Sequence, residues 1–190
     1  MEPLKKVIIE LGELISKKYE ELKGLENKVK ALEQKNDAHE QYSRRNNLRL
    51  HGIQETPDEN LEEVVVTLMN KELQLDPPLA SADIDRLHRI GPRNPDQSQR
   101  PRQVILKLTS YRTRERIYKS RAKLRHSACQ VYVNEDLTKP RASLLWAARQ
   151  EKKKGKIQDV WSYDGKVSIK LLNGRITAIN DREHLGTLVN

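Results

Sequence analysis

Apolar side chains recur along residues 4–39 at alternating steps of four and three residues. Read as heptads, the a positions are Ile8, Ile15, Leu22, Val29 and Asn36, and the d positions are Leu4, Leu11, Lys18, Leu25, Leu32 and His39. A stripe that repeats every 3.5 residues is buried only against similar stripes, so residues 1–43 are predicted to form an oligomerising coiled coil. The alternative is a single amphipathic helix packed on its own downstream domain, but a helix of about 60 Å exceeds what a small domain covers.

The side chains beside this stripe bear on the number of helices. Lys28 at a g position and Glu33 at an e position are placed to form an ion pair beside Val29 and Leu32, and Asn36 fixes the register. A basic, apolar, two variable, apolar, Glu string is typical of parallel trimers. We expect a parallel homotrimer rather than a dimer, with these oligomerisation residues: Ile8, Leu11, Ile15, Leu22, Leu25, Lys28, Val29, Leu32, Glu33 and Asn36.

The helical period gives way to strand alternation within residues 42–54. Over 44–135 the pattern predicts strands at 47–53, 83–90, 104–108 and 130–133, and helices at 60–73 and 110–124, the first capped by Asn60. Residues 92–101 hold three prolines and predict a flexible hairpin loop. The order β-α-β-β-α-β is that of the ferredoxin-like arrangement used by RNA-recognition motifs, in which one sheet face is free for bases.

Residues 136–190 predict a smaller C-terminal nucleic-acid-binding domain. A helix begins at Thr138 and stops before Gly155, and strands at 157–163, 166–172 and 175–180 are joined by Asp-Gly and Asn-Gly turns before a last helix at 181–188. The expected fold class is therefore α+β, with a coiled-coil helix, a ferredoxin-like domain and a small α/β domain containing a three-stranded meander.

The amino-acid composition limits the kinds of partner that the chain is expected to bind. Only 36% of residues are hydrophobic, 33% are charged and none is Phe, which favours small modules over one large core. The net charge of +9 points to an anionic partner, with nucleic acid as the first candidate, and the chain holds neither an 18-residue apolar run nor a signal-peptide pattern. The single cysteine, Cys129, excludes an intramolecular disulfide, suits a reducing compartment and is predicted to be a buried strand residue.

The positive charge is concentrated in residues 100–125, which hold ten Lys and Arg against one acidic residue, Glu115. A helix that is merely solvated normally interleaves Glu with its basic residues, so this segment predicts phosphate binding. The third strand carries no aromatic residue for base stacking, so backbone contact with low sequence selectivity and strong salt dependence is expected. The candidate contacts here are Arg102, Lys107, Arg112, Arg116, Lys119 and Arg121. Tyr163 in the C-terminal domain is either a core residue or a stacking surface for a base.

Three segments carry a resemblance to a known family. They are ArgArgAsnAsnLeuArgLeuHisGlyIle at 44–53, ValAsnGluAspLeuThr at 133–138 and IleGlnAspValTrpSerTyrAspGlyLysVal at 157–167. Together with the preceding coiled coil, they resemble the first open-reading-frame protein of LINE retrotransposons (LINE-one type) and the related LINE-one type transposase domain-containing proteins, over essentially the whole chain. The coiled coil begins almost at Met1 and is short for that family, which predicts an absent N-terminal portion or a truncated copy.

The resemblance implies a homotrimeric, sequence-tolerant single-stranded RNA-binding protein that also binds single-stranded DNA. Such a protein coats the RNA of its element and acts as a nucleic-acid chaperone in target-primed reverse transcription, in a cytoplasmic ribonucleoprotein that also enters the nucleus and includes the element's reverse transcriptase. The family's RNA contacts fall here on Arg45, Arg49, Lys119, Arg141 and Tyr163. Their neighbours Arg44, Asn47 and Lys166 complete the candidate nucleic-acid contacts.

Two other functions compete with this one. A host coiled-coil adaptor would use its α/β domains to bind protein, independently of ionic strength, which the basic density of 100–125 argues against. An enzyme is not expected, because the histidines at 39, 51, 88, 126 and 184 have no metal-ligand spacing, no Gly-rich phosphate loop is present, and Asp83 and Asp85 form an isolated acidic pair. We therefore expect no catalytic residue, cofactor or metal.

Overall fold

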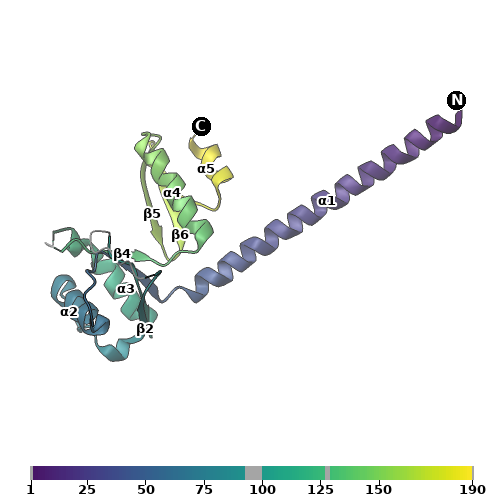
Figure 1. Cartoon of the computed structure of the whole chain (residues 1–190). Helices are drawn as coiled ribbons and strands as arrows, with labels where there is room; N and C mark the ends of the chain where they lie inside the picture. The colour runs from purple at the N-terminus through teal and green to yellow at the C-terminus, as the bar shows by residue number, and fades with distance from the viewer. Residues whose placement is uncertain (1, 93–99, 127–128, 190) are drawn as a thin grey trace. The chain divides into compact units, whose positions relative to one another are not determined.

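The computed structural model describes residues 2–92, 100–126 and 129–189 (Figure 1). The chain divides into two compact units, Met1–Glu40 and Gln41–Asn190. The fold class is mixed α+β, as predicted, with a long N-terminal helix, an antiparallel four-stranded sheet and a separate three-stranded sheet. Of the predicted hairpin loop at 92–101, residues 93–99 lie outside the described residues.

The first unit is a single helix, the greater part of α1 (Glu2–Ser43). Its large apolar side chains lie in solvent, with exposures between 50% for Val7 and 70% for Leu4. The apolar residues predicted at a and d positions, from Ile8 to Leu32, all belong to this exposed set. Helices in proteins are stabilised mainly by packing of an apolar face, and the apolar face of α1 is exposed. Packing against another helix would bury this face.

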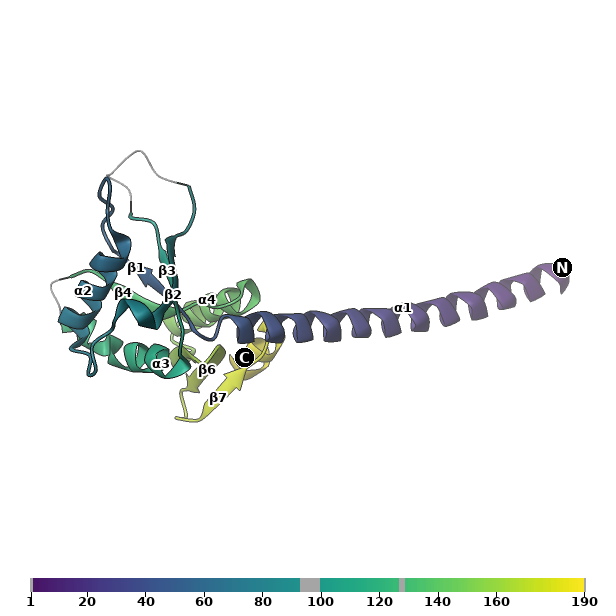
Figure 2. The same ribbon diagram turned by 90° about the horizontal axis from the view of Figure 1, so that it is seen from below.

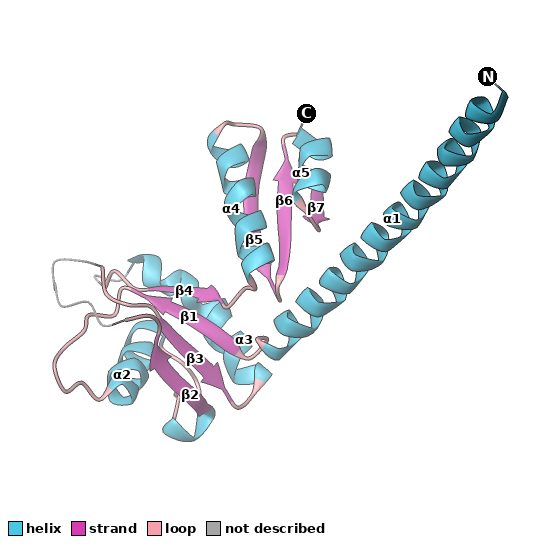
Figure 3. Ribbon diagram, turned by 45° about the vertical axis from the view of Figure 1, so that its right-hand side comes forward, coloured by secondary structure: helices cyan, strands magenta, loops and turns pink. Residues whose placement is uncertain are grey.

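The second unit begins with the four-stranded sheet. Along the chain its elements are β1 (Asn47–His51), α2 (Leu61–Leu73), β2 (Ile84–Arg89), β3 (Val104–Leu108), α3 (Tyr111–Ser120) and β4 (Tyr132–Glu135), with short 3-10 turns at Ser81–Asp83 and Arg121–His126. The strands lie in the order β2-β3-β1-β4, and each pairs antiparallel with its neighbours (Figure 3).

Strand alternation sets the core of this sheet. Leu48 and Leu50 of β1 and Leu106 of β3 are fully buried, whereas the residues between them face the other side of the sheet. The buried face packs against α2 and α3 through Met69 and Ile117. Both helices therefore lie on one face of the sheet, and the opposite face carries polar side chains such as Arg49 of β1 and Asn134 of β4.

The rest of the second unit is built on the three-stranded sheet. Its elements are α4 (Lys139–Lys153), β5 (Ile157–Tyr163), β6 (Lys166–Leu171), β7 (Ile176–Ile179) and α5 (Arg182–Val189). Strand β6 lies between β5 and β7 (Figure 3), and Figure 2 shows β6 and β7 side by side. A second core forms where Leu144 and Ala148 of α4 meet Ile157 and Ile169. The two predicted turn dipeptides are confirmed, since Asp164-Gly165 and Asn173-Gly174 connect the strands, with φ of 74° and 85° at the two glycines.

Three predicted elements differ from the structure by two residues or more. The strand predicted at 47–53 is β1, which ends at His51. The strand predicted at 130–133 is β4, two residues later, and Cys129 is half-buried and outside it, so the predicted buried strand cysteine is wrong. The reason lies at Gly52, which ends β1 with a φ of 86° and leaves no room for a side chain, because an added Cβ would be 2.0 Å from the Gln130 carbonyl oxygen. Without an extended β1 beside them, residues 130–131 have no strand to pair with.

The helix predicted at 110–124 also ends early. The α-helix stops at Ser120, and the chain continues as a 3-10 turn to His126. Two side chains bind the backbone there, since the Arg121 guanidinium donates to the Tyr118 carbonyl at 2.5 Å and Lys123 donates to the Leu73 carbonyl at 2.7 Å. Such bonds satisfy carbonyl groups that a helix end leaves without partners.

A buried arginine joins the loops at one end of the four-stranded sheet. The Arg89 side chain on β2 is 4% exposed, and its Nε and Nη2 donate to both carboxylate oxygens of Glu59 at 2.6 and 2.7 Å. It also donates to the backbone carbonyls of Ile53 and Arg102, at 3.0 and 3.1 Å. One guanidinium thus fixes the loop before α2 and the start of β3.

We expect Glu59→Gln to lower the free energy of unfolding by about 2 kcal/mol at pH 7, because Arg89 would lose its charged acceptor. Hydrogen bonding from Arg89 holds the pKa of Glu59 below its ordinary value of 4.5. The ionised carboxylate therefore stabilises the fold above pH 4.5, and this contribution is lost as the pH falls further.

Urea denaturation followed by near-ultraviolet circular dichroism measures this difference, which should shrink between pH 7 and pH 3. The exposed Glu62, on the same helix end, provides the control: Glu62→Gln should cost about 0.5 kcal/mol. An equal loss for Glu59→Gln at both pH values would contradict the role of its charge.

Candidate nucleic-acid interface

Three distant segments meet at what we call the junction, formed by Gln41, Glu135, Asp136, Gly165 and their direct partners. Gln41 is buried at the end of α1, and its side-chain amide donates to the Asp136 carbonyl at 3.2 Å. The same side chain accepts a hydrogen bond from the Thr138 backbone N–H at 2.9 Å. One glutamine therefore satisfies the backbone of the link between β4 and α4.

The Asp136 carboxylate is the first of two buried acids in the junction. Its side chain is 2% exposed and accepts hydrogen bonds from Arg44 at 3.2 Å, Asn47 at 3.0 Å and Arg49 at 2.5 Å. Arg49 also donates to the Gln103 side chain at 3.1 Å. Two arginines and an amide surround one carboxylate, so its burial is compensated by charge and by three hydrogen bonds.

Glu135 is the second buried acid. Its carboxylate is 1% exposed and bonds the guanidinium of Arg114, itself 2% exposed, at 2.5 Å. The Nε and Nη1 of Arg114 have no hydrogen-bond partner among the described residues, but the ring of Tyr118 lies 4.7 Å from its guanidinium carbon. That ring face supplies attraction where hydrogen bonds are absent.

The β5–β6 turn closes the junction. The Gly165 backbone N–H donates to Glu135 at 3.3 Å, and its carbonyl accepts from Arg141 at 2.9 Å. Gly165 has no space for a side chain, because an added Cβ would lie 2.6 Å from Cγ of Gln41. Nearby, the Tyr118 hydroxyl donates to the Ser162 carbonyl at 3.0 Å, so α3 is fixed directly to β5.

The junction contains four of the residues predicted to contact nucleic acid. Arg44, Asn47 and Arg49 are bound to Asp136, and Arg141 is bound to the Gly165 carbonyl. In this structure these side chains hold protein segments together. The Arg44 and Arg49 side chains are still 30% exposed, so the predicted contact of these residues with nucleic acid stays a prediction beside this structural role.

Two further predicted cations, Arg102 just before β3 and Lys107 on β3, are paired with carboxylates. Arg102 donates to Glu55 at 2.9 and 3.0 Å, and Lys107 lies 2.5 Å from Asp85. The hydrogen bond from Arg102 is the main cause that lowers the pKa of Glu55. Each pair cancels its own charge, so Arg102 and Lys107 add little to the field of the open sheet face.

A cluster around Tyr163 brings predicted residues of α3 and the three-stranded sheet together. The Tyr163 hydroxyl donates to Glu115 at 2.8 Å, and Lys119 pairs with the same carboxylate at 2.9 Å. This hydrogen bond raises the pKa of Tyr163 to about 12. Lys166 stands opposite Tyr163 in the β5–β6 register and is exposed. The tyrosine ring is 42% exposed and so remains open on one side.

The remaining predicted cations have no carboxylate partner among the described residues. Arg112 is exposed, and Arg116 is half-buried with its Nε atom unpaired. Arg45 lies over the exposed Tyr42 ring at 4.1 Å, and Arg121 lies 3.6 Å from the Tyr118 ring centre. We define the α3 cation face as Arg112, Arg116, Lys119 and Lys166, beside Tyr163.

Gln41, Glu135 and Asp136 were not predicted as site residues. The signal for Glu135 and Asp136 in the sequence was that they form an adjacent acidic pair between a predicted strand and a predicted helix in a strongly basic chain. Arg114 also differs from expectation, since it belongs to the basic segment by sequence but is buried. Its spacing of three and four residues from Ile117 and Tyr118 places it on the apolar side of α3.

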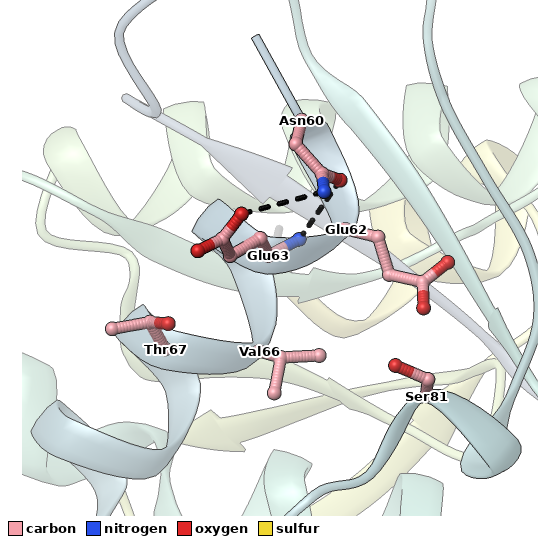
Figure 4. A pocket seen from close by; sticks show the side chains of 6 residues that line it. All are labelled: Asn60, Glu62, Glu63, Val66, Thr67 and Ser81. Atoms are coloured by element: carbon pink, nitrogen blue, oxygen red, sulfur yellow. Dashed lines mark hydrogen bonds between the residues drawn. The ribbon is translucent and has the colours of Figure 1, made fainter.

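Other features of the second unit do not suit an anionic ligand. A hollow beside the start of α2 is lined by Asn60, Glu62, Glu63, Val66, Thr67 and Ser81, and Figure 4 shows Asn60 bonded to Glu63 at its rim. Its carboxylates repel phosphate.

Within the described ranges no group of His, Cys, Asp and Glu side chains is arranged to hold a metal ion. No described helix has the length and apolarity needed to cross a membrane.

We expect Asp136→Asn to lower the free energy of unfolding by about 3 kcal/mol, because it leaves the Arg44–Arg49 pair without its buried counter-charge. The control is Asp159→Asn, which removes an exposed carboxylate paired with Lys152 and should cost less than about 1 kcal/mol. Urea denaturation followed by tryptophan fluorescence reports on the second unit, which contains Trp146 and Trp161. Equal losses in the two variants would contradict the role assigned to Asp136.

Comparison with known proteins adds no relative: no protein-family model matches the chain, and no curated protein matches it in sequence. Function is therefore inferred from the residues of the chain and their geometry.

Proposed function

We propose that this protein binds single-stranded RNA and single-stranded DNA with little sequence preference and acts as a nucleic-acid chaperone. The observation that carries the proposal is the α3 cation face, where Tyr163 is 42% exposed, bonds Glu115 on α3 and stands opposite Lys166, while Arg112 and Arg116 on α3 have no carboxylate partner among the described residues. Lysine and arginine bind phosphates of any sequence, and an aromatic ring stacks on any base.

The fold of residues 44–135 supports this assignment. Its chain order β-α-β-β-α-β and sheet order β2-β3-β1-β4 fit a ferredoxin-like domain of the kind that RNA-recognition motifs use. Base stacking is not assigned to its third strand, because Ile105 and Lys107 are the β3 side chains on the open face. The contacts are assigned instead to α3 and to the adjoining β5–β6 hairpin.

Association through a coiled coil would raise the overall affinity for RNA even where each protein–RNA contact is weak. The exposed apolar stripe of α1 supports association of several chains, and the heptad positions and the Lys28–Glu33 spacing favour a parallel homotrimer. Three linked copies of one RNA-binding surface raise the effective concentration for each further contact. A protein of this kind can exchange individual contacts while remaining on the strand, which is what a chaperone requires.

The position of the three resemblance segments in the structure supports the proposal that the chain belongs to the LINE-type first open-reading-frame proteins. The three segments that carry the resemblance, 44–53, 133–138 and 157–167, contribute most of the junction that fixes α3 beside the β5–β6 hairpin. On this proposal the chain acts in a cytoplasmic ribonucleoprotein that also reaches the nucleus, with the reverse transcriptase of its element as a partner.

We expect Arg112→Ala, Arg116→Ala and Lys166→Ala, combined in one variant, to weaken single-stranded RNA binding by about a hundredfold, since each charged contact contributes at least about 1 kcal/mol. The slope of log affinity against log salt should fall in magnitude by about 2, because three phosphate contacts are lost. Fluorescence anisotropy with an unstructured RNA, titrated at several salt concentrations, measures both quantities.

Lys71→Ala is the control for charge alone, because Lys71 is an exposed lysine on α2, outside the α3 cation face. It should leave the affinity within about twofold. If the triple variant bound as tightly as the unaltered protein, the α3 cation face would not be the binding surface.

Tyr163 separates stacking from hydrogen bonding. Tyr163→Phe keeps the ring and removes the bond to Glu115, so RNA affinity should be retained within about threefold. Tyr163→Ala removes the ring and should cost about 1–3 kcal/mol of binding. The same anisotropy titration decides between them: equal losses in both variants would show that the ring does not stack on a base.

A further inference from the structure

Helix α4 carries an exposed face that neither its core nor the junction uses. Lys139, Ala142, Trp146, Arg149 and Lys153 recur at steps of three and four residues, and all five are exposed. The opposite side of the helix packs on the three-stranded sheet through Leu144, Leu145 and Ala148 (Figure 3). The exposed side has an aromatic ring near its centre and three cations along its length.

The charge of this face is not cancelled by the protein. The single acid of α4, Glu151, lies on another side of the helix and bonds Lys154 at 2.7 Å, while Lys152 bonds Asp159 at 2.7 Å. Lys139, Arg149 and Lys153 have no carboxylate partner in the part of the chain that the structure describes. The helix therefore separates paired lysines on its flank from three unpaired cations on the face with Trp146.

Helix stability does not account for this arrangement. Cations in the last turn, such as Lys153, favour the helix dipole, but Lys139 in the first turn opposes it. Trp146 is 60% exposed, although tryptophan is the residue that gains most from burial. The small Ala142 side chain, one turn before Trp146, leaves the indole face accessible.

We infer that this face of α4 is a second single-stranded nucleic-acid site, in which a base stacks on Trp146 while phosphates bind Arg149, Lys153 and Lys139. The inference rests on the proposed function and extends it to a surface separate from the α3 cation face. The face is about 21 Å long, which accommodates several nucleotides of an extended strand. A duplex presents phosphates but keeps its bases stacked inside, so the site discriminates in favour of single strands.

The test uses the full chain and a short labelled oligouridine at low salt. Trp146→Ala should weaken binding about tenfold, and Arg149→Ala with Lys153→Ala should weaken it by a similar factor. The matched control is Lys152→Ala with Lys154→Ala, which removes two neighbouring lysines that are already paired and should change the affinity less than twofold. Near-ultraviolet circular dichroism checks that each variant remains folded.

A second measurement reports stacking directly. The emission that belongs to Trp146, obtained as the difference between the unaltered protein and Trp146→Phe, should be quenched by the single strand. A duplex of the same length should leave that emission largely unchanged. Quenching by both to the same extent would overturn the stacking assignment.

The outcomes separate this inference from the proposed function. Tight binding of the oligouridine that is unaffected by the α4 variants would overturn the second site and leave the α3 cation face in place. Loss of binding in Arg112→Ala/Arg116→Ala/Lys166→Ala together with residual quenching of Trp146 would support two separate sites. If the unaltered protein bound no single-stranded nucleic acid at all, both proposals would fall.

Discussion

The second unit depends on two neighbouring carboxylates that are kept away from water. Asp136 and Glu135 are 2% and 1% exposed, and each is stabilised by arginines and neutral hydrogen-bond donors from other segments. Moving a carboxylate out of water costs several kcal/mol, so a buried acid requires its partners to arrive in the correct geometry. The three segments of the junction are therefore coupled, because losing one partner leaves a buried charge uncompensated.

Because of this coupling, not every basic residue of the chain contributes to the positive charge of its surface. An excess of basic residues in the sequence suggests a uniformly positive surface, yet Arg44, Arg49 and Arg114 are bound to buried acids. On the four-stranded sheet, Arg89 is paired with Glu59 and Lys107 with Asp85. The net charge is concentrated instead on α3 and α4, whose exposed faces hold few acids. An anionic ligand is attracted to these helices more than to the sheet.

Local patterns predicted most of the fold. The strands at 104–108 and 157–163 and the turns that follow Tyr163 and Leu172 were predicted closely, because alternation and Gly-containing dipeptides are local signals. The Asn60 cap was predicted for the same reason, and its side chain accepts from the Glu63 backbone N–H. By contrast, the end of β1 at Gly52 depends on the approach of Gln130, a contact that only the folded chain creates.

The candidate site was predicted less completely than the fold. Residue type identifies a cation but not what neutralises it, so Arg49 and Arg112 look alike in sequence although only one is held by a buried acid. That distinction arises from tertiary pairing over more than eighty residues of chain. The same limit applies to Trp146. A tryptophan in a helix can be a core residue or a surface residue, and only the folded structure shows that Trp146 is 60% exposed.

The position of the two buried acids bears on how the protein can be dissected. Glu135 is the last residue of β4, and the peptide bond that follows it would be a natural place to divide the chain into separate domains. A fragment ending at that bond would keep Arg44 and Arg49 but lose Asp136, whereas the complementary fragment would carry Asp136 without either arginine. The first fragment would then carry two arginines without their counter-charge, and the second would expose at its cut end a carboxylate that is buried in the intact chain. The affinity of each fragment for nucleic acid would be altered by these changes in charge. An affinity measured on such fragments would reflect the cut as much as the native surfaces.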